Sequence, residues 1–189
     1  MLDKTNFEKE LERLGSKRAK ADAIRTRMSK SISEKCGENP VFYKKFSERI
    51  DEVLKAYREA RISEGEYLNK MKGIVDDYRK GDSGIVYPSI IKNNPHAQAF
   101  YGVIKEQVYQ INEDRGVYGP MADLSLKIKS IIDKHVKVDF HDNIDIHNRI
   151  AQEIDDLLFD FKKENNLELP IEQIDKIIEK IKSISLKRF

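Results

Sequence analysis

Apolar residues recur three and four positions apart along most of the chain, which is the spacing of one face of an α-helix. In the first segment, residues 5–35, the apolar positions are Leu11, Leu14, Ala21, Ile24, Met28 and Ile32. Gly15 and Ser16 interrupt this segment, and we expect a break there because both residues weaken a helix interior. The pattern therefore predicts helices at the start of the chain.

Later helix boundaries are marked by local signals. Two Asn-Pro pairs predict helices that begin at Pro40 and Pro95, because asparagine caps a free backbone N–H and proline fits the first helical position. Ser63 and Glu66 have the spacing of a capping box, which predicts a third helix start. Gly81 is predicted to end that helix.

The C-terminal half continues the helical pattern. A turn is predicted at residues 114–120 and is followed by an isoleucine-rich helix. Residues 136–139 (VKVD) are predicted to be extended, and Asp139 is expected to cap the next helix. Pro170 is expected to open the last helix.

The sequence predicts an all-α fold, an irregular bundle of about six to eight helices. Residues 82–93 lack helical periodicity. The chain therefore forms a single helical domain over residues 1–189, or two helical subdomains, 1–81 and 94–189, with 82–93 as an irregular connector. The composition agrees, with nine Gly and five Pro in 189 residues, 39% apolar residues to form a core and 36% charged residues to cover it.

Cysteine content and hydropathy bear on location. The lone Cys36 cannot form an internal disulfide, and no apolar run approaches the roughly 20 residues that a membrane span needs. The charged N-terminus lacks the apolar stretch of a signal peptide. We therefore expect a cytoplasmic protein with no membrane partner. Cys36 is interpreted as a structural thiol, because a nucleophile would also need a base and an oxyanion site.

The most basic stretch is residues 15–35, GSKRAKADAIRTRMSKSISEK. It holds seven Lys and Arg and two acidic residues, a charge of +5, whereas the whole chain carries +2. Its candidates for contact with DNA phosphates are Lys17, Arg18, Lys20, Arg25, Arg27 and Lys30. On a helix, four of them surround the apolar stripe instead of lining one strip, namely Lys17, Lys20, Arg27 and Lys30, so a solvated helix face is the alternative. The scarcity of acids favours phosphate contact, but the spacing leaves both interpretations open.

Motifs for catalysis are missing from the sequence. It contains no GxxxxGK[ST] or GxGxxG loop, no C-x-x-C, no H-E-x-x-H and no G-x-S-x-G. The best metal-ligand candidates are His135, Asp139, His141, Asp142, Asp145 and His147. If one helix carried His141 and His147, their side chains would point about 120° apart, which is a poor shared site. We predict no catalytic, metal or cofactor site in this chain.

The last predicted helix carries four regularly spaced isoleucines. They are Ile174, Ile177, Ile181 and Ile184. The stripe either belongs to the core of its own bundle or docks a partner helix. These four residues are the candidate partner-docking residues.

Several stretches resemble the C-terminal part of the restriction (R) subunit of type I restriction–modification enzymes. They are residues 7–50 (FEKELERLGSKRAKADAIRTRMSKSISEKCGENPVFYKKFSERI), 60–71 (ARISEGEYLNKM), 97–104 (AQAFYGVI), 131–143 (IIDKHVKVDFHDN) and the tail after Pro170. The GSK…ADAI…SEK pattern, the NP-x-FYKKFSE run and RISE-x-EYL are specific in combination. Cys36 and Phe140 depart from the family pattern, which has Met and often Trp at these positions.

The resemblance implies an origin and a role. The full R subunit is an ATP-dependent DNA translocase and a type I site-specific deoxyribonuclease that uses ATP and Mg²⁺. Its nuclease and motor domains precede this helical region, so the chain is expected to be a fragment that starts after the second motor domain. The region is thought to dock the motor subunit onto the methyltransferase and specificity subunits. No catalytic motif of the family falls in the matching stretches, which implies a fragment without activity or cofactor.

Three hypotheses follow. The first is a helical assembly module that binds the partner subunits. The second is a module whose basic first helix contacts DNA, which is compatible with the first. The third, kept as a control, is a metal-dependent hydrolase built on the His and Asp cluster. The resemblance favours the first and supports a role for the basic stretch against DNA or a neighbouring motor domain.

Overall fold

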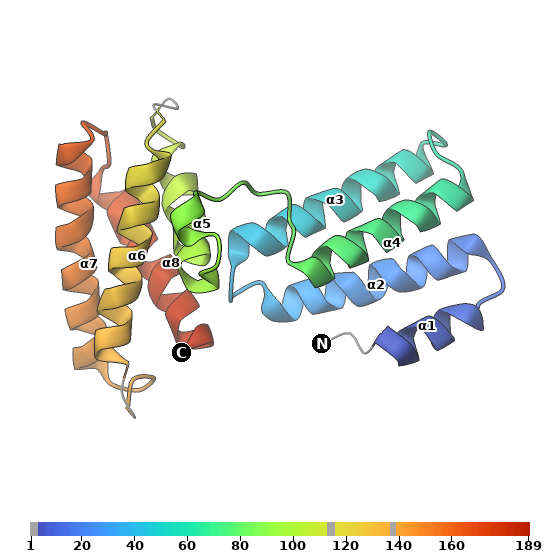
Figure 1. Cartoon of the computed structure of the whole chain (residues 1–189), viewed down its shortest axis with the longest axis horizontal. Helices are drawn as coiled ribbons and strands as arrows, with labels where there is room; N and C mark the ends of the chain where they lie inside the picture. The colour runs from blue at the N-terminus through green and yellow to red at the C-terminus, as the bar shows by residue number, and fades with distance from the viewer. Residues whose placement is uncertain (1–3, 113–115, 137–138) are drawn as a thin grey trace. The chain divides into compact units, whose positions relative to one another are not determined.

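The computed structural model describes residues 4–112, 116–136 and 139–189, with side chains from Glu8 onward. These ranges contain eight α-helices and one short 3-10 helix, and they contain no strand (Figure 1). The predicted all-α class is confirmed, and the helix number lies at the upper end of the predicted range.

The chain divides into two compact units. The N-terminal unit comprises Met1–Cys36 and Phe42–Ile85, and the C-terminal unit comprises Gly37–Val41 and Val86–Phe189. The second boundary lies inside the predicted connector 82–93, which contains only a short 3-10 helix. Each unit has its own cluster of buried apolar side chains.

Four helices form the N-terminal unit. They are α1 (Lys4–Glu12), α2 (Lys17–Lys35), α3 (Pro40–Arg58) and α4 (Glu64–Lys80). The expected break separates α1 from α2, where the Ser16 side chain accepts a hydrogen bond from the Ala19 N–H at 3.0 Å. This break divides the predicted segment 5–35 into two helices.

Local capping chemistry fixes both ends of α4, as predicted. The Ser63 hydroxyl accepts from the Glu66 N–H at 3.3 Å, and the Glu66 carboxylate accepts from the Ser63 N–H at 2.8 Å. At the other end Gly81 adopts the left-handed conformation with φ 73°. Glycine accepts this conformation without the steric cost that a Cβ imposes.

Large aromatic side chains connect α3 to α4. The Phe46 and Tyr78 ring centroids lie 5.3 Å apart at 80°, and those of Tyr57 and Tyr67 lie 4.5 Å apart in a parallel stack. The helices α2 and α4, by contrast, pack closely along their backbones. The fully buried members of this core include Ala21, Ile24, Met28, Phe46, Tyr67 and Met71.

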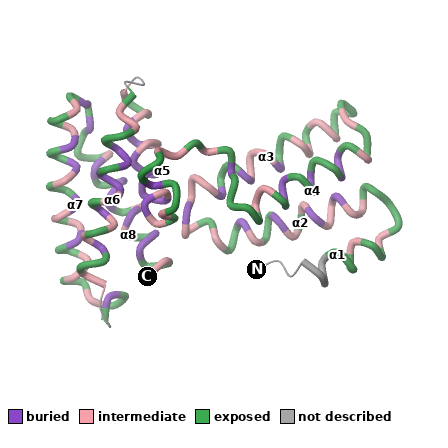
Figure 2. The backbone as a smooth tube through the Cα atoms, in the orientation of Figure 1, coloured by how far each residue is buried: buried purple, intermediate pink, exposed green. Residues whose placement is uncertain are grey.

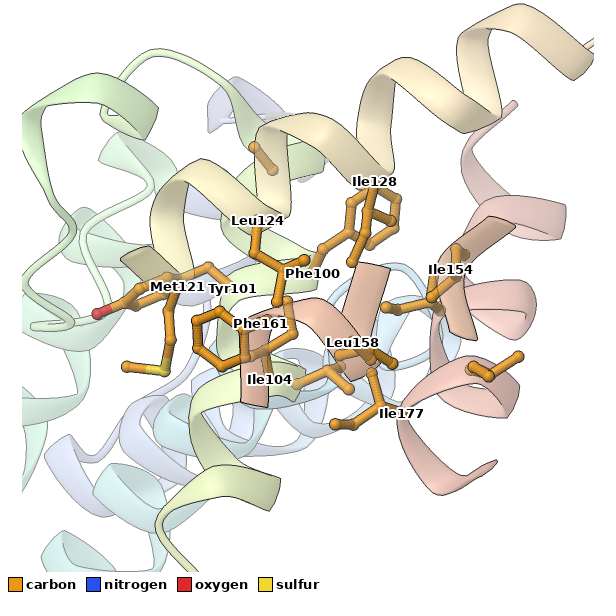
Figure 3. Close-up of a cluster of buried hydrophobic side chains, with 14 of the residues drawn as sticks. Phe100, Tyr101, Ile104, Met121, Leu124, Ile128, Ile154, Leu158, Phe161 and Ile177 are labelled. Carbon is orange, nitrogen blue, oxygen red and sulfur yellow. The ribbon is translucent and has the colours of Figure 1, made fainter. Parts of the chain in front are cut away.

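The C-terminal unit is a four-helix arrangement. Its elements are η1 (Ser89–Ile91), α5 (Pro95–Val108), α6 (Tyr118–His135), α7 (Ile144–Glu164) and α8 (Ile171–Arg188). Each α-helix packs on the next, and α8 also packs on α5, so the four helices surround one core. Figure 2 shows buried positions recurring along these helices, and Figure 3 shows the side chains that meet inside. They include Phe100, Tyr101, Ile104, Met121, Leu124, Ile128, Ile154, Leu158, Phe161 and Ile177.

The predicted start of α7 is wrong. The helix begins at Ile144, where the Asn143 side chain caps it by accepting from the Asp145 and Ile146 N–H groups at 3.1 and 3.2 Å. Asp139 instead accepts a hydrogen bond from the Asn143 side chain at 2.6 Å. Because His141 precedes the helix, its expected angle to a second histidine on the same helix does not apply.

Parts of two predicted segments lie outside the described residues. They are residues 114–115 of the predicted turn 114–120 and residues 137–138 of the predicted extended segment 136–139. No helix in the described ranges combines the length and apolarity that crossing a bilayer requires.

Two long-range polar contacts close the C-terminal unit. The Asn112 side chain donates to the Glu168 carbonyl at 2.7 Å and accepts from the Glu168 N–H at 2.9 Å. The Arg188 guanidinium donates to the Pro95 carbonyl at 2.5 Å. These contacts join the end of α5 to the loop before α8, and the end of α8 to the start of α5.

Candidate functional site

Three of the six candidate phosphate-contacting residues on the basic helix α2 form ion pairs. Arg18 and Arg25 each lie 3.8 Å from the Asp22 carboxylate, and Arg27 lies 2.8 Å from Glu10 on α1. The remaining candidates, Lys17, Lys20 and Lys30, form no ion pair among the described residues. Among the six candidates, these three lysines are therefore the cations most available to an external phosphate.

The six candidates do not form one strip. Residues seven apart lie above one another on a helix, so Arg18 and Arg25 share one flank, and Lys20 and Arg27 share another. Asp22 accompanies the first flank, whereas Arg27 reaches the α1 side through Glu10. The cations surround the buried stripe of α2, as the sequence pattern predicted.

A buried tyrosine anchors the acidic residue of α2. The Tyr67 hydroxyl donates to Asp22 Oδ1 at 3.0 Å, which connects α4 to α2. Burial, together with this bond to a carboxylate, raises the pKa of Tyr67 to about 12. Asp22 therefore acts as a structural group of the N-terminal unit and partly neutralises the arginines beside it.

The two units differ in charge. The N-terminal unit holds 20 Lys and Arg against 15 Asp and Glu, which gives +5. The C-terminal unit holds 15 Lys and Arg against 18 Asp and Glu, which gives −3. A polyanion is therefore expected to prefer the N-terminal unit, and a basic partner the C-terminal unit.

The isoleucine stripe of α8 lies in the core. Ile174, Ile177, Ile181 and Ile184 are each 3% exposed or less and belong to the buried cluster of the C-terminal unit. Of the two interpretations that the sequence left open, burial agrees with packing inside the bundle. A partner could reach these side chains only if α8 left its own unit.

Two apolar side chains that the sequence analysis did not single out are exposed instead. Phe159 on α7 is 45% exposed and Ile171 on α8 is 74% exposed, and both line a groove of about 730 Å³ between these helices. Helical spacing could have identified Phe159, because it points away from the buried stripe that contains Leu158 and Phe161. That it shares a groove with Ile171 depends on how α7 and α8 pack.

Two of the metal-ligand candidates, His135 and His147, are engaged in structural contacts. His135 Nε2 lies 2.6 Å from the Glu153 carboxylate, which connects α6 to α7, and this hydrogen bond lowers the pKa of Glu153. His147 Nε2 donates to the Phe140 carbonyl at 2.6 Å. In the described part of the chain, no three His, Cys, Asp or Glu residues are grouped so as to hold a metal ion.

The two positions that depart from the family pattern differ in burial. Phe140 is buried in the core of the C-terminal unit. Cys36 follows α2 as its C-cap and is exposed. Cys36 is therefore not part of the buried core, and its interpretation as a structural thiol stays a prediction.

Comparison with known proteins identifies a family. The family model for the C-terminal region of proteins described as "Type I restriction enzyme HindI endonuclease subunit-like" matches residues 2–185. A search among curated proteins finds no match, and a search among solved structures finds none either. Because the match spans nearly the whole chain and agrees with the all-α fold, the protein belongs to the family of C-terminal regions of type I restriction enzyme HindI endonuclease subunit-like proteins.

Proposed function

We propose that this chain is a non-catalytic assembly module of a type I restriction enzyme. It docks the endonuclease subunit onto the methyltransferase and specificity subunits in the cytoplasm. The observation that carries the proposal is the family match over residues 2–185, which names the C-terminal region of an endonuclease subunit from a multi-subunit enzyme class. In this account the parent protein uses ATP and Mg²⁺ for translocation and cleavage through regions that lie outside this chain.

The side-chain chemistry supports a structural module. Three groups of a kind that can serve catalysis are engaged in structural contacts: Glu153 accepts from His135 and Lys134, and His147 donates to the Phe140 carbonyl. A general acid or base needs access to a substrate, whereas these groups connect α6 to α7 and fasten α7 to the loop before it.

Competition with the complete enzyme tests the proposal. Excess purified chain is added to an active enzyme assembled from its endonuclease, methyltransferase and specificity subunits, and ATP-dependent DNA cleavage is measured. We expect inhibition that additional endonuclease subunit reverses, because both proteins would compete for one docking surface. Undiminished cleavage at a large molar excess of folded chain would contradict docking through this region.

A second candidate function is contact with DNA through α2. It is supported by the +5 charge of the N-terminal unit and by three lysines without ion pairs among the described residues, Lys17, Lys20 and Lys30. Each phosphate contact contributes about −0.9 to the slope of log affinity against log salt. Three lysine contacts would give a slope of about −2.7, and contacts from all six candidates about −5.4.

Salt titration of DNA binding distinguishes these cases. For the wild-type chain we expect a slope of about −2.7, the value for three lysine contacts. The slope should be near zero after Lys17, Lys20 and Lys30 are all changed to Gln. Binding that is independent of salt, or unaffected by the triple substitution, would contradict contact through α2.

A further inference from the structure

The groove between α7 and α8 has an apolar floor shared with the core. Ile174 and Ile178 of α8 line it and are buried, so the floor is held in place by the packing of the C-terminal unit. Phe159 and Ile171 project beside them and remain exposed. Adjacent exposed apolar side chains over a preformed floor are typical of an interaction surface.

The chain itself only partly shields this surface. The ammonium groups of Lys162 and Lys163 lie 5.1 and 4.2 Å from the Phe159 ring centroid. Such cation–π contacts at an exposed site are weaker than complete burial of a phenylalanine ring. A partner that buries Phe159 would therefore gain more than the two lysines lose.

Negative charge lines both sides of the groove. Asp155 stands on α7, and Asp175 and Glu179 stand on α8. Asp155 and Asp175 form no ion pair among the described residues, whereas Glu179 lies 3.2 Å from Lys182. Lys162 is the one cation among the described lining residues, so the lining is net negative and complementary to a basic partner.

The lining also favours one partner conformation. An extended peptide leaves its backbone N–H and C=O groups needing partners, and it usually finds them on a sheet edge. The described part of this chain has no sheet, and the groove is lined by residues of two helices, α7 and α8. A helix satisfies its own backbone and presents apolar side chains at positions i, i+3, i+4 and i+7.

We propose that the groove between α7 and α8 binds an amphipathic α-helix of a partner subunit, with an apolar stripe over Phe159 and Ile171 and Lys or Arg residues beside Asp155 and Asp175. The inference deepens the proposed assembly function and rests on it. The partner is defined by its chemistry: a short helix whose apolar face is bordered by positive charge.

Binding of the purified chain to the methyltransferase–specificity complex, measured at low and moderate salt, tests this site. We expect the double variant F159A/I171A to bind at least tenfold more weakly. The variant D155K/D175K should lose affinity to a similar extent, mostly at low salt, where charge pairs contribute most. Both variants should keep the wild-type circular dichroism spectrum and unfolding midpoint, because the replaced side chains lie at the surface.

The chain offers matched controls. Ile144 is 72% exposed at the first position of α7, as Ile171 is at the first position of α8, but Ile144 does not line the groove. Asp156 adjoins Asp155 on the exposed side of α7 and is also outside the lining. I144A and D156K should bind within twofold of wild type.

The outcomes separate the site from the function. Wild-type binding that both groove variants retain would overturn the groove while leaving the assembly function standing. Failure of the wild-type chain to bind would overturn both. A photo-crosslinker placed at position 159 should join a partner segment with the stated helical pattern, and an acidic or extended segment there would overturn the proposed helix.

Discussion

The Tyr67 hydroxyl donates to the Asp22 carboxylate at 3.0 Å, although the two residues are 45 positions apart in the sequence. The same carboxylate lies 3.8 Å from both Arg18 and Arg25. One acidic residue thus fastens the basic helix α2 to α4 and offsets part of its charge. Stability and charge of the N-terminal unit are therefore coupled at Asp22.

Removing the Tyr67 hydroxyl should weaken the N-terminal unit. Tyr67→Phe deletes the bond to Asp22 and leaves the ring stack with Tyr57, so we expect a loss of about 1 kcal/mol in the free energy of unfolding, measured in urea. Tyr57→Phe is the matched control, because the Tyr57 hydroxyl lies 3.5 Å from Glu64, at the limit of hydrogen bonding. Equal losses in the two variants would contradict a specific role for the Asp22 contact.

Alkaline pH should lower the stability of the N-terminal unit through Tyr67. The pKa of Tyr67 is raised from 10.0 to about 12, so folding favours the protonated hydroxyl. Its contribution is complete below pH 10 and is lost as the pH rises toward about 12. Urea midpoints measured across this interval should fall more steeply for the wild type than for Tyr67→Phe. Parallel pH profiles would contradict the assignment.

Releasing the two arginines should strengthen any DNA binding by α2. Asp22→Asn removes the carboxylate beside Arg18 and Arg25, and we expect affinity for duplex DNA at low salt to rise by about two- to fivefold. Asp51→Asn is the control, because it changes the net charge equally from an exposed position on α3. The same gain in both variants would show an effect of net charge alone, and no gain in Asp22→Asn would count against contact at this flank.

The Asn112 bridge should stabilise the C-terminal unit. Asn112→Ala removes two hydrogen bonds to the Glu168 backbone and one to the Val108 carbonyl, so we expect a loss of about 1–3 kcal/mol in the free energy of unfolding. Asn148→Ala, at an exposed position of α7, should change it by less than about 0.5 kcal/mol. Amide hydrogen exchange should locate the effect at the end of α5 and the loop before α8, and a loss spread evenly over both units would disagree.

Mild acid should destabilise the C-terminal unit through His96. Burial lowers the pKa of His96, and the positive charges of Arg188 and Lys129 lower it further, whereas Asp133 acts in the opposite direction. The His96 ring packs edge-on against the Phe189 ring, with 4.4 Å between the ring centroids. Unfolding therefore favours protonation, so stability is complete above the ordinary pKa of about 6.5 and decreases as the pH falls below it. The unfolding midpoint should drop between about pH 7 and pH 5 in the wild type but much less in His96→Gln. Glu153, whose pKa is lowered, keeps its contribution to stability above its ordinary value of 4.5 and loses it only below that pH, so it adds nothing to the change between pH 7 and pH 5.

Local chemistry explains which parts of the fold the sequence predicts. Ser63, Gly81 and Asn94 cap helices through groups within three or four residues, so their predicted roles follow from spacing. Ser16 was predicted only to mark a break, and the structure shows that it also caps α2. The start of α7 was predicted incorrectly because Asp139 and Asn143 are both good caps. The tertiary position of the preceding loop decides between them, and spacing does not encode it.

In the candidate sites, too, local contacts follow from sequence spacing, whereas contacts between helices depend on tertiary packing. The pairing of Asp22 with Arg18 and Arg25 follows from helical spacing, whereas the pair between Arg27 and Glu10 crosses a helix break. The groove requires α7 and α8 to be packed before Phe159 and Ile171 can be seen to share it. A single helical pattern marks each exposed side chain but cannot bring two helices together.

Direct binding to the partner subunits tests the central claim most plainly. The purified chain is mixed with the purified methyltransferase–specificity complex, and the mass of the assemblies is measured, with the full endonuclease subunit as positive control. The account predicts a stable complex that contains the chain and is lost in F159A/I171A. If the full subunit assembles while the folded chain remains free at micromolar concentration, the chain is not the docking module of its parent enzyme.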